Sequence, residues 1–259
     1  MATKSKRTPH RSVRTKRPAP DDGLPKHIVA ALRLAWPTGV VESRDSDDDD
    51  ALLNKYSKLK ASLSRIPDAR ILHEREPRSG QDWEEGSDEE AELPDWDDGL
   101  RSYYLFFVSP TGESFEFETD TLEPDEDGIE CRFVGQGWMG WAVGISVIAP
   151  FAAVKFDQME IFENGSRMEP DIEPHMFSLD GGRFDWEKEW KEVIGEEVLV
   201  ALKNLRAKIV QLLQKAGIAV IPEVDLSRAV PWLRAGEDAL VGQRGIPITV
   251  EQAFFFRSL

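Results

Sequence analysis

The most regular pattern of apolar positions lies in residues 185–217. Apolar side chains recur there in steps of three and four, which places them on one face of an α-helix. The stripe consists of Trp186, Trp190, Ile194, Val198, Leu202, Leu205, Ile209 and Leu212 or Leu213. Gly217 is the expected end, and Gly195 allows either one long helix or two helices in line. A stripe this wide needs a broad apolar partner, which only the strand-rich segment before it can supply.

Two shorter helices are predicted nearer the N-terminus. The first covers residues 25–36, with Ile28, Leu32 and Trp36 on one side, and Pro37 ends it. The second follows the acidic run at residues 47–50, and its stripe consists of Leu52, Tyr56, Leu59, Leu63 and Ile66. Acidic residues favour a helix start, whereas four consecutive carboxylates without a turn glycine do not converge on one cation. We therefore interpret the run as a helix cap.

Period-two patterns between the second helix and the long helix predict strands. Residues 103–108 and 115–119 flank the turn sequence at 109–112, which predicts a hairpin. Residues 129–134 are expected to form a further strand. Because the strands cluster before the long helix, the pattern indicates an α+β fold. We expect an antiparallel β-sheet packed against one long, possibly interrupted, amphipathic helix.

The second half of the chain adds three local signals. Asn164-Gly165 predicts a hairpin between residues 158–163 and 166–172. After the long helix, an edge strand is expected at residues 218–221 and a short helix at residues 225–230. Thr249 and Gln252 match a capping box that starts a last helix. The three phenylalanines in that helix, Phe254, Phe255 and Phe256, are expected to belong to the core.

The net charge of −16 is distributed unevenly along the chain. The first twenty residues contain no acid and seven basic residues: Lys4, Lys6, Arg7, Arg11, Arg14, Lys16 and Arg17. Subtracting these seven charges leaves about −23 on the rest of the chain. A body this acidic repels nucleic acid and membrane surfaces and attracts basic partners. Nucleic acid is therefore expected to bind only through residues 1–17, if at all.

Composition divides the chain into four parts. Residues 1–24 form a disordered basic arm, residues 25–76 a short helical segment, residues 77–98 an acidic linker and residues 99–259 the α+β domain. The single cysteine, Cys131, excludes an internal disulfide. The sequence contains no run of about 18 apolar residues, so no membrane span is predicted. These features favour a cytoplasmic protein.

The acidic linker contains two tryptophans, which is unusual for a spacer. Each indole lies between acidic residues, in Asp82-Trp83-Glu84 and in Asp95-Trp96-Asp97. One interpretation is a docking segment in which the indoles fill pockets of a partner while the carboxylates meet its basic residues. The other is that one or both indoles fold back on the protein's own core.

A glycine motif follows the strand predicted at residues 129–134. Gly135, Gly137 and Gly140 form a GxGxxG pattern, and Asp157 lies near the spacing of an acidic ribose ligand. The pattern resembles the fingerprint of Rossmann dinucleotide-binding proteins, which implies NAD or NADP and a helix after the third glycine. The alternative is a glycine-rich strand connection that bends beneath Trp138 and Trp141. Whether residues 141–148 are helix or strand separates the two interpretations.

A possible metal site lies at the end of the second hairpin. Asp171, Glu173 and His175 alternate, so a strand would place three metal-compatible ligands on one side. Pro170 and Pro174 favour an exposed edge instead, and no second histidine is near in sequence. We therefore expect neither a metal nor a cofactor.

The leading hypothesis is a non-catalytic acidic domain that binds a basic protein partner. In composition alone, the chain resembles small bacterial immunity and antitoxin proteins. One alternative is a nucleotide-dependent oxidoreductase that uses the glycine motif. The other is a nucleic-acid-associated factor tethered by its basic arm.

Overall fold

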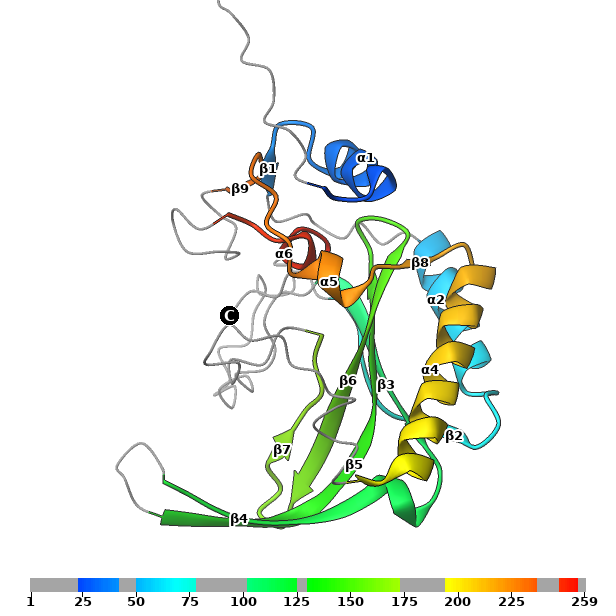
Figure 1. Cartoon of the computed structure of the whole chain (residues 1–259), viewed down its shortest axis with the longest axis vertical. Helices are drawn as coiled ribbons and strands as arrows, with labels where there is room; N and C mark the ends of the chain where they lie inside the picture. Colours follow the sequence, from blue (N-terminus) through cyan, green and yellow to red (C-terminus); the bar gives the residue numbers. More distant parts are fainter. Residues whose placement is uncertain are drawn as a thin grey trace, which may run out of the picture.

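A mostly antiparallel β-sheet forms the centre of the structure, which is a computed structural model (Figure 1). It describes residues 23–41, 50–77, 102–124, 130–172, 194–236 and 247–255. The main order of strands is β2 (Ala69–Arg75), β3 (Tyr103–Pro110), β5 (Glu130–Ser146), β6 (Phe151–Phe162) and β7 (Arg167–Met168). Two more strands pair off this path, β4 (Glu116–Pro124) with β5 and β8 (Ala219–Val220) with β6. The predicted α+β class is confirmed.

Strands β3 and β4 do not pair with each other, so the predicted hairpin at residues 103–119 is wrong. Both pair antiparallel with β5 and along the same edge, β3 with residues 141–146 and β4 with residues 130–138. The turn residues and a 3-10 helix (Glu113–Phe115) bulge out of the strand, after which the chain resumes its direction. The Thr111 N–H donates to the carbonyl of Asp68 at 2.9 Å, which ties this bulge to the start of β2.

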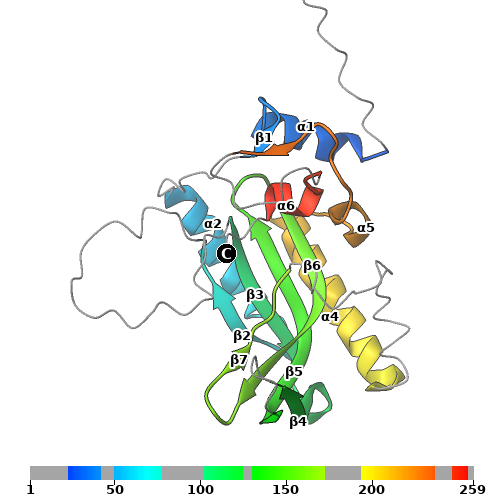
Figure 2. The same cartoon turned by 90° about the vertical axis from the view of Figure 1, so that its left-hand side faces the viewer.

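Helices α2 (Asp50–Leu63) and α4 (Glu196–Lys215) cover one face of the sheet (Figures 1 and 2). Alternate residues of β3 and β5, such as Phe106 and Val143, face them in one buried cluster. The indole N–H of Trp141 donates to the carbonyl oxygen of Leu202 at 2.9 Å, which fixes α4 against β5. The predicted stripes supply the helical side of this core: Tyr56, Leu59 and Leu63 from α2, and Leu202, Leu205, Ile209 and Leu213 from α4.

The ends of α4 follow from two glycines. Gly195 has φ +82° and ψ 163°, which no helix permits, so the helix starts at Glu196 and does not run through this residue. Residues 185–193 of the predicted helix lie outside the described residues. At the other end Gly217 has φ +75°, and the N–H of Ile218 donates to Leu213 at 2.9 Å. This is a Schellman end, and the predicted stop at Gly217 is confirmed.

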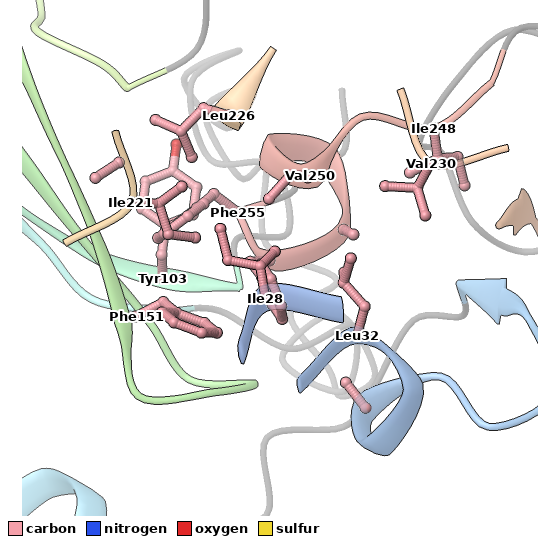
Figure 3. Packing of buried hydrophobic residues seen from close by; sticks show 14 of the residues in the cluster. Ile28, Leu32, Tyr103, Phe151, Ile221, Leu226, Val230, Ile248, Val250 and Phe255 are labelled. Atoms are coloured by element: carbon pink, nitrogen blue, oxygen red, sulfur yellow. The ribbon is translucent and has the colours of Figure 1, made fainter. Parts of the chain in front are cut away.

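A second core lies on the opposite face and at the end of the sheet (Figure 3). It joins α1 (Lys26–Ala35), α5 (Glu223–Leu226) and α6 (Val250–Phe254) to β3 and β6. Phe254 and Phe255 are fully buried there, as the sequence predicts, while Phe256 lies outside the described residues. The capping box of Thr249 and Gln252 is confirmed at the start of α6. A small parallel pair, β1 (Val40–Val41) with β9 (Arg234–Ala235), completes this end.

The hairpin of β6 and β7 is confirmed, with Gly165 at φ +86° in its turn. Strand β7 is shorter than predicted because it covers only Arg167–Met168. The chain that follows, through Asp171, leaves the sheet and packs against its second face. The edge strand predicted at residues 218–221 is confirmed as β8, which pairs parallel with the start of β6.

Candidate functional site

The glycine motif lies inside strand β5 and not in a turn before a helix. Gly135, Gly137 and Gly140 stand opposite residues of β6, with Gly140 opposite Asp157. The strand continues to Ser146, so residues 141–146 do not offer the free N–H groups of a helix start. A phosphate-binding glycine loop depends on those groups. The geometric condition for a Rossmann site is therefore not met at these residues.

The glycines are explained by close packing within the sheet. A Cβ on Gly140 would lie 2.6 Å from the carbonyl oxygen of Val108 and 2.9 Å from the ring of Phe107. On Gly137 it would collide with the ring of Phe117, which covers that glycine from β4. Gly140 therefore leaves no room for a side chain beside the backbone of β3, whereas Gly137 admits one only if the ring of Phe117 moves.

Asp157 and Asp171, candidates for two different sites in the sequence, meet in one cluster. The N–H of Asp171 donates to Oδ2 of Asp157 at 2.8 Å. Oδ1 of Asp171 accepts from the hydroxyl of Tyr103 at 2.5 Å and from the N–H of Ile172 at 2.6 Å. These bonds hold the chain after β7 against β3 and β6, and Ile172 then packs directly on Gly144.

An ion pair beside this cluster joins β6 to the C-terminal helix. Nζ of Lys155 contacts Oε1 of Glu251, and the two side chains are only 12% and 6% exposed. Burial raises the pKa of Glu251, with smaller contributions in the same direction from Glu223 and Asp171, while Lys155 lowers it. Lys155 thus favours the ionised carboxylate, whereas burial and the neighbouring acids favour the neutral form.

A third group of charges extends the cluster to β2. Arg75 forms an ion pair with Glu169, and Nε2 of His73 lies 3.6 Å from a Glu169 oxygen. The strand register places His73 and Arg75 of β2 on the same face of the sheet as Lys155 and Asp157 of β6. We call these three largely buried groups, Asp157 with Asp171, Lys155 with Glu251, and Arg75 and His73 with Glu169, the buried belt. We interpret the belt as a clamp that fastens α6 and the segment after β7 to the sheet, since buried charges are costly unless they are paired.

The proposed metal ligands are only partly described. Asp171 has the hydrogen bonds given above and does not belong to a strand, whereas Glu173 and His175 lie outside the described residues. Within the described ranges, no group of three or more His, Cys, Asp or Glu side chains is placed to hold a metal ion.

The remaining candidate is strand β4, which projects with the start of β5 beyond the helices (Figure 1). Its acidic residues Glu116, Glu118 and Asp120 alternate, so they lie on one face. Glu116 accepts from Arg70 at 2.5 Å, and Asp120 pairs with Arg132 at 2.7 and 2.6 Å. Hydrogen bonding to Arg132 lowers the pKa of Asp120. Glu118 is exposed and has no ion pair with any described residue.

The outer edge of β4 is open, because among the described residues this strand pairs only with β5. The N–H of Glu163, just after β6, donates to the carbonyl of Val134 at 2.8 Å. The backbone groups of Val134 therefore point toward β6 and away from β4. Asp120 stands opposite Val134, and its own N–H and C=O therefore point to the outer edge. By the same alternation, Glu118 and Leu122 present their backbone groups there.

The sequence did not identify this edge, because the hairpin prediction gave β4 a partner that it does not have. It also missed Lys155 and Glu251. A signal for the buried belt was present in β6, where Lys155 and Asp157 interrupt an apolar strand two positions apart. Such a spacing places both charges on one face.

The predicted partner-binding residues Asp82, Trp83, Glu84, Asp95, Trp96 and Asp97 lie outside the described residues. No described helix has the length and apolar character needed to cross a membrane. Comparison with protein-family models, with curated proteins and with solved structures finds no match to this chain.

Proposed function

We propose that this protein is a non-catalytic, acidic interaction domain of the cytoplasm that binds a basic protein partner. The observation that carries the proposal is the exposed acidic face of β4, which stands clear of both cores. Its charges lie at the surface, where they attract a partner over several ångströms and speed association. In composition, this chain is similar to small bacterial immunity and antitoxin proteins.

The buried charges support binding over catalysis. A catalytic acid or base needs access to a substrate, whereas Lys155, Glu251 and Asp157 are engaged with groups of the fold itself. On β4, in contrast, Glu118 and Asp120 are exposed, and Glu118 has no ion pair with a described residue.

The proposal is tested by capture with the full chain as bait. We expect a basic protein to bind the wild-type chain and to be released by salt. The variant with Glu118→Lys and Asp120→Lys should not capture this protein, since each reversed charge then repels the basic partner. Thermal unfolding of both baits is the control, because these exposed positions should shift stability little. Capture of the same protein by both baits would contradict the proposal.

The acidic segment at residues 82–98 is proposed as a second contact, with Trp83 and Trp96 as its anchors. Truncating an anchoring tryptophan costs about 2 kcal/mol or more, or roughly thirtyfold in affinity. We therefore expect Trp83→Ala or Trp96→Ala to weaken binding of the captured protein by about that factor. If both variants bind as wild type but unfold at lower temperature, the indoles belong to the protein's own core.

A further inference from the structure

We propose that the open edge of β4 takes up an extended segment of the partner as an additional β-strand, and that this segment carries basic residues at alternate positions. The inference rests on the proposed function and specifies how the partner binds. Three features of β4 carry it: the outward backbone groups, the charged face, and the opposite face with Phe117.

The backbone of β4 offers hydrogen bonds that the described structure does not use. Glu118, Asp120 and Leu122 direct N–H and C=O groups outward, by the alternation set at Val134. Glu116 marks the start of the open part, because its N–H already donates to Glu113. An edge of this length matches a short extended peptide, and strand addition is an established way to bind one.

The side chains of the edge select the charge of the added strand. Glu116, Glu118 and Asp120 are two residues apart, so a neighbouring strand would place every second side chain beside them. Lysine or arginine at those positions would complete cross-strand ion pairs, most directly with Glu118, which has no ion pair with a described residue. An acidic or neutral strand would leave Glu118 without an ion pair, whereas Glu116 and Asp120 already pair with Arg70 and Arg132.

The same row excludes a second copy of β4 as the occupant. Two β4 edges placed side by side would bring like charges together, the usual means by which edge strands avoid self-association. An extended segment with basic residues meets no such repulsion and is attracted by the same carboxylates.

The opposite face of β4 carries Phe117, Thr119 and Thr121. Phe117 is half-buried, and the same face continues over Phe133 of β5 and Phe162 of β6, whose rings meet edge to face with 5.4 Å between their centroids. Apolar or β-branched residues between the basic ones would lie beside this row of β4. The preferred segment therefore alternates basic and apolar residues.

The direct test is amide hydrogen exchange of the full chain with a synthetic peptide of alternating lysine and valine. The amides of Glu118, Asp120 and Leu122 should exchange rapidly in the free protein and slow on addition of the peptide. Thr119 and Thr121, whose amides face β5, should not change and serve as internal controls. A peptide of alternating glutamate and valine should have no effect. Slow exchange at all three outward amides before any peptide is added would overturn the proposal, because the edge would already be occupied.

A matched pair of variants separates strand addition from simple charge attraction. Leu122→Pro removes one outward N–H without changing the charge, and Leu122→Ala keeps that N–H. We expect Leu122→Pro to weaken peptide binding at least about fivefold relative to Leu122→Ala, the value of one lost hydrogen bond. If the two variants bind equally while Glu118→Lys with Asp120→Lys abolishes binding, strand addition is wrong and the acidic surface stands. If the charge reversal also has no effect on captured partner or peptide, the proposed function fails as well.

Discussion

Lys155→Met is expected to lower the free energy of unfolding by about 3–5 kcal/mol near neutral pH. This is the usual cost of removing one member of a buried ion pair, because the remaining charge stays buried without a partner. The lysine is the cation that contacts the buried carboxylate of Glu251 and lowers its pKa. Without it, desolvation and the nearby acids Glu223 and Asp171 act unopposed on that carboxylate. Chemical denaturation at neutral pH measures the loss.

The same variant should recover stability as the pH falls. Burial already raises the pKa of Glu251 above its ordinary value of 4.5, and losing Lys155 raises it further. An acid with a raised pKa in the folded state binds its proton more tightly there than in the unfolded chain. Stability is therefore lost as the pH rises from 4.5 through the folded-state pKa, and it is regained on acidification. The difference between variant and wild type should be smaller at about pH 5 than at about pH 7.5.

Combining Lys155→Met with Glu251→Leu is the matched control. Removing both charges leaves no buried ion without a partner, and such replacements are often neutral or stabilising. The double variant should be more stable than Lys155→Met at neutral pH and should lose its pH dependence. Equal stability of the single and double variants would show that the pair does not clamp α6 to β6.

Gly140→Ala is expected to lower the free energy of unfolding by about 2–3 kcal/mol. The added methyl group meets the carbonyl of Val108 and the ring of Phe107, both in the neighbouring strand β3 and both fully buried. Neither can move without disturbing the pairing of β3 with β5. Thermal or chemical unfolding measures the effect.

Gly137→Ala is the comparison, because the three atoms nearest to its methyl group all belong to the ring of Phe117 and none to the backbone. That ring is half-buried and can rotate, so the loss should be smaller, below about 1.5 kcal/mol. The explanation of these glycines by close packing would be contradicted if Gly140→Ala were as stable as wild type and instead abolished a measurable affinity for NAD or NADP.

Helices and local caps could be predicted from the sequence because their signals lie within a few residues. The stripe of α4 from Leu202 to Leu213, its glycine end and the capping box of Thr249 need no knowledge of the rest of the chain. The Asn164-Gly165 turn likewise fixes which strands it joins. In each case the interaction that forms the element connects near neighbours.

The strand arrangement could not be predicted in the same way. The turn signal at Ser109–Gly112 shows where the chain leaves β3, but not which strand β4 then pairs with. Strand β5 is longer than its pattern suggests because its glycines accept close neighbours from β3, β4 and β6. Those contacts come from residues distant in sequence, so no local period reveals them.

Two residues of the buried belt stand out in the sequence, but for other roles. The sequence patterns point to ribose binding by Asp157 and metal binding by Asp171, whereas in the structure the N–H of Asp171 donates to Asp157 and the hydroxyl of Tyr103 donates to Asp171. Lys155 and Glu251 are 96 residues apart, so their pairing leaves no sequence pattern. The acidity of the chain was evident, but its exposure on an open strand edge depends on the pairing of β4.

The central claim is that acidic side chains of this domain bind a basic protein, and its most direct measurement is a calorimetric titration with the captured partner. Exposed charges are screened beyond about 10 Å at 0.1 M salt and more strongly at higher salt. We predict that affinity falls at least about tenfold between about 50 and 300 mM salt, and that Glu118→Lys with Asp120→Lys binds weakly at both. An affinity that is the same at both salt concentrations, and the same for the charge-reversed variant, would contradict the account.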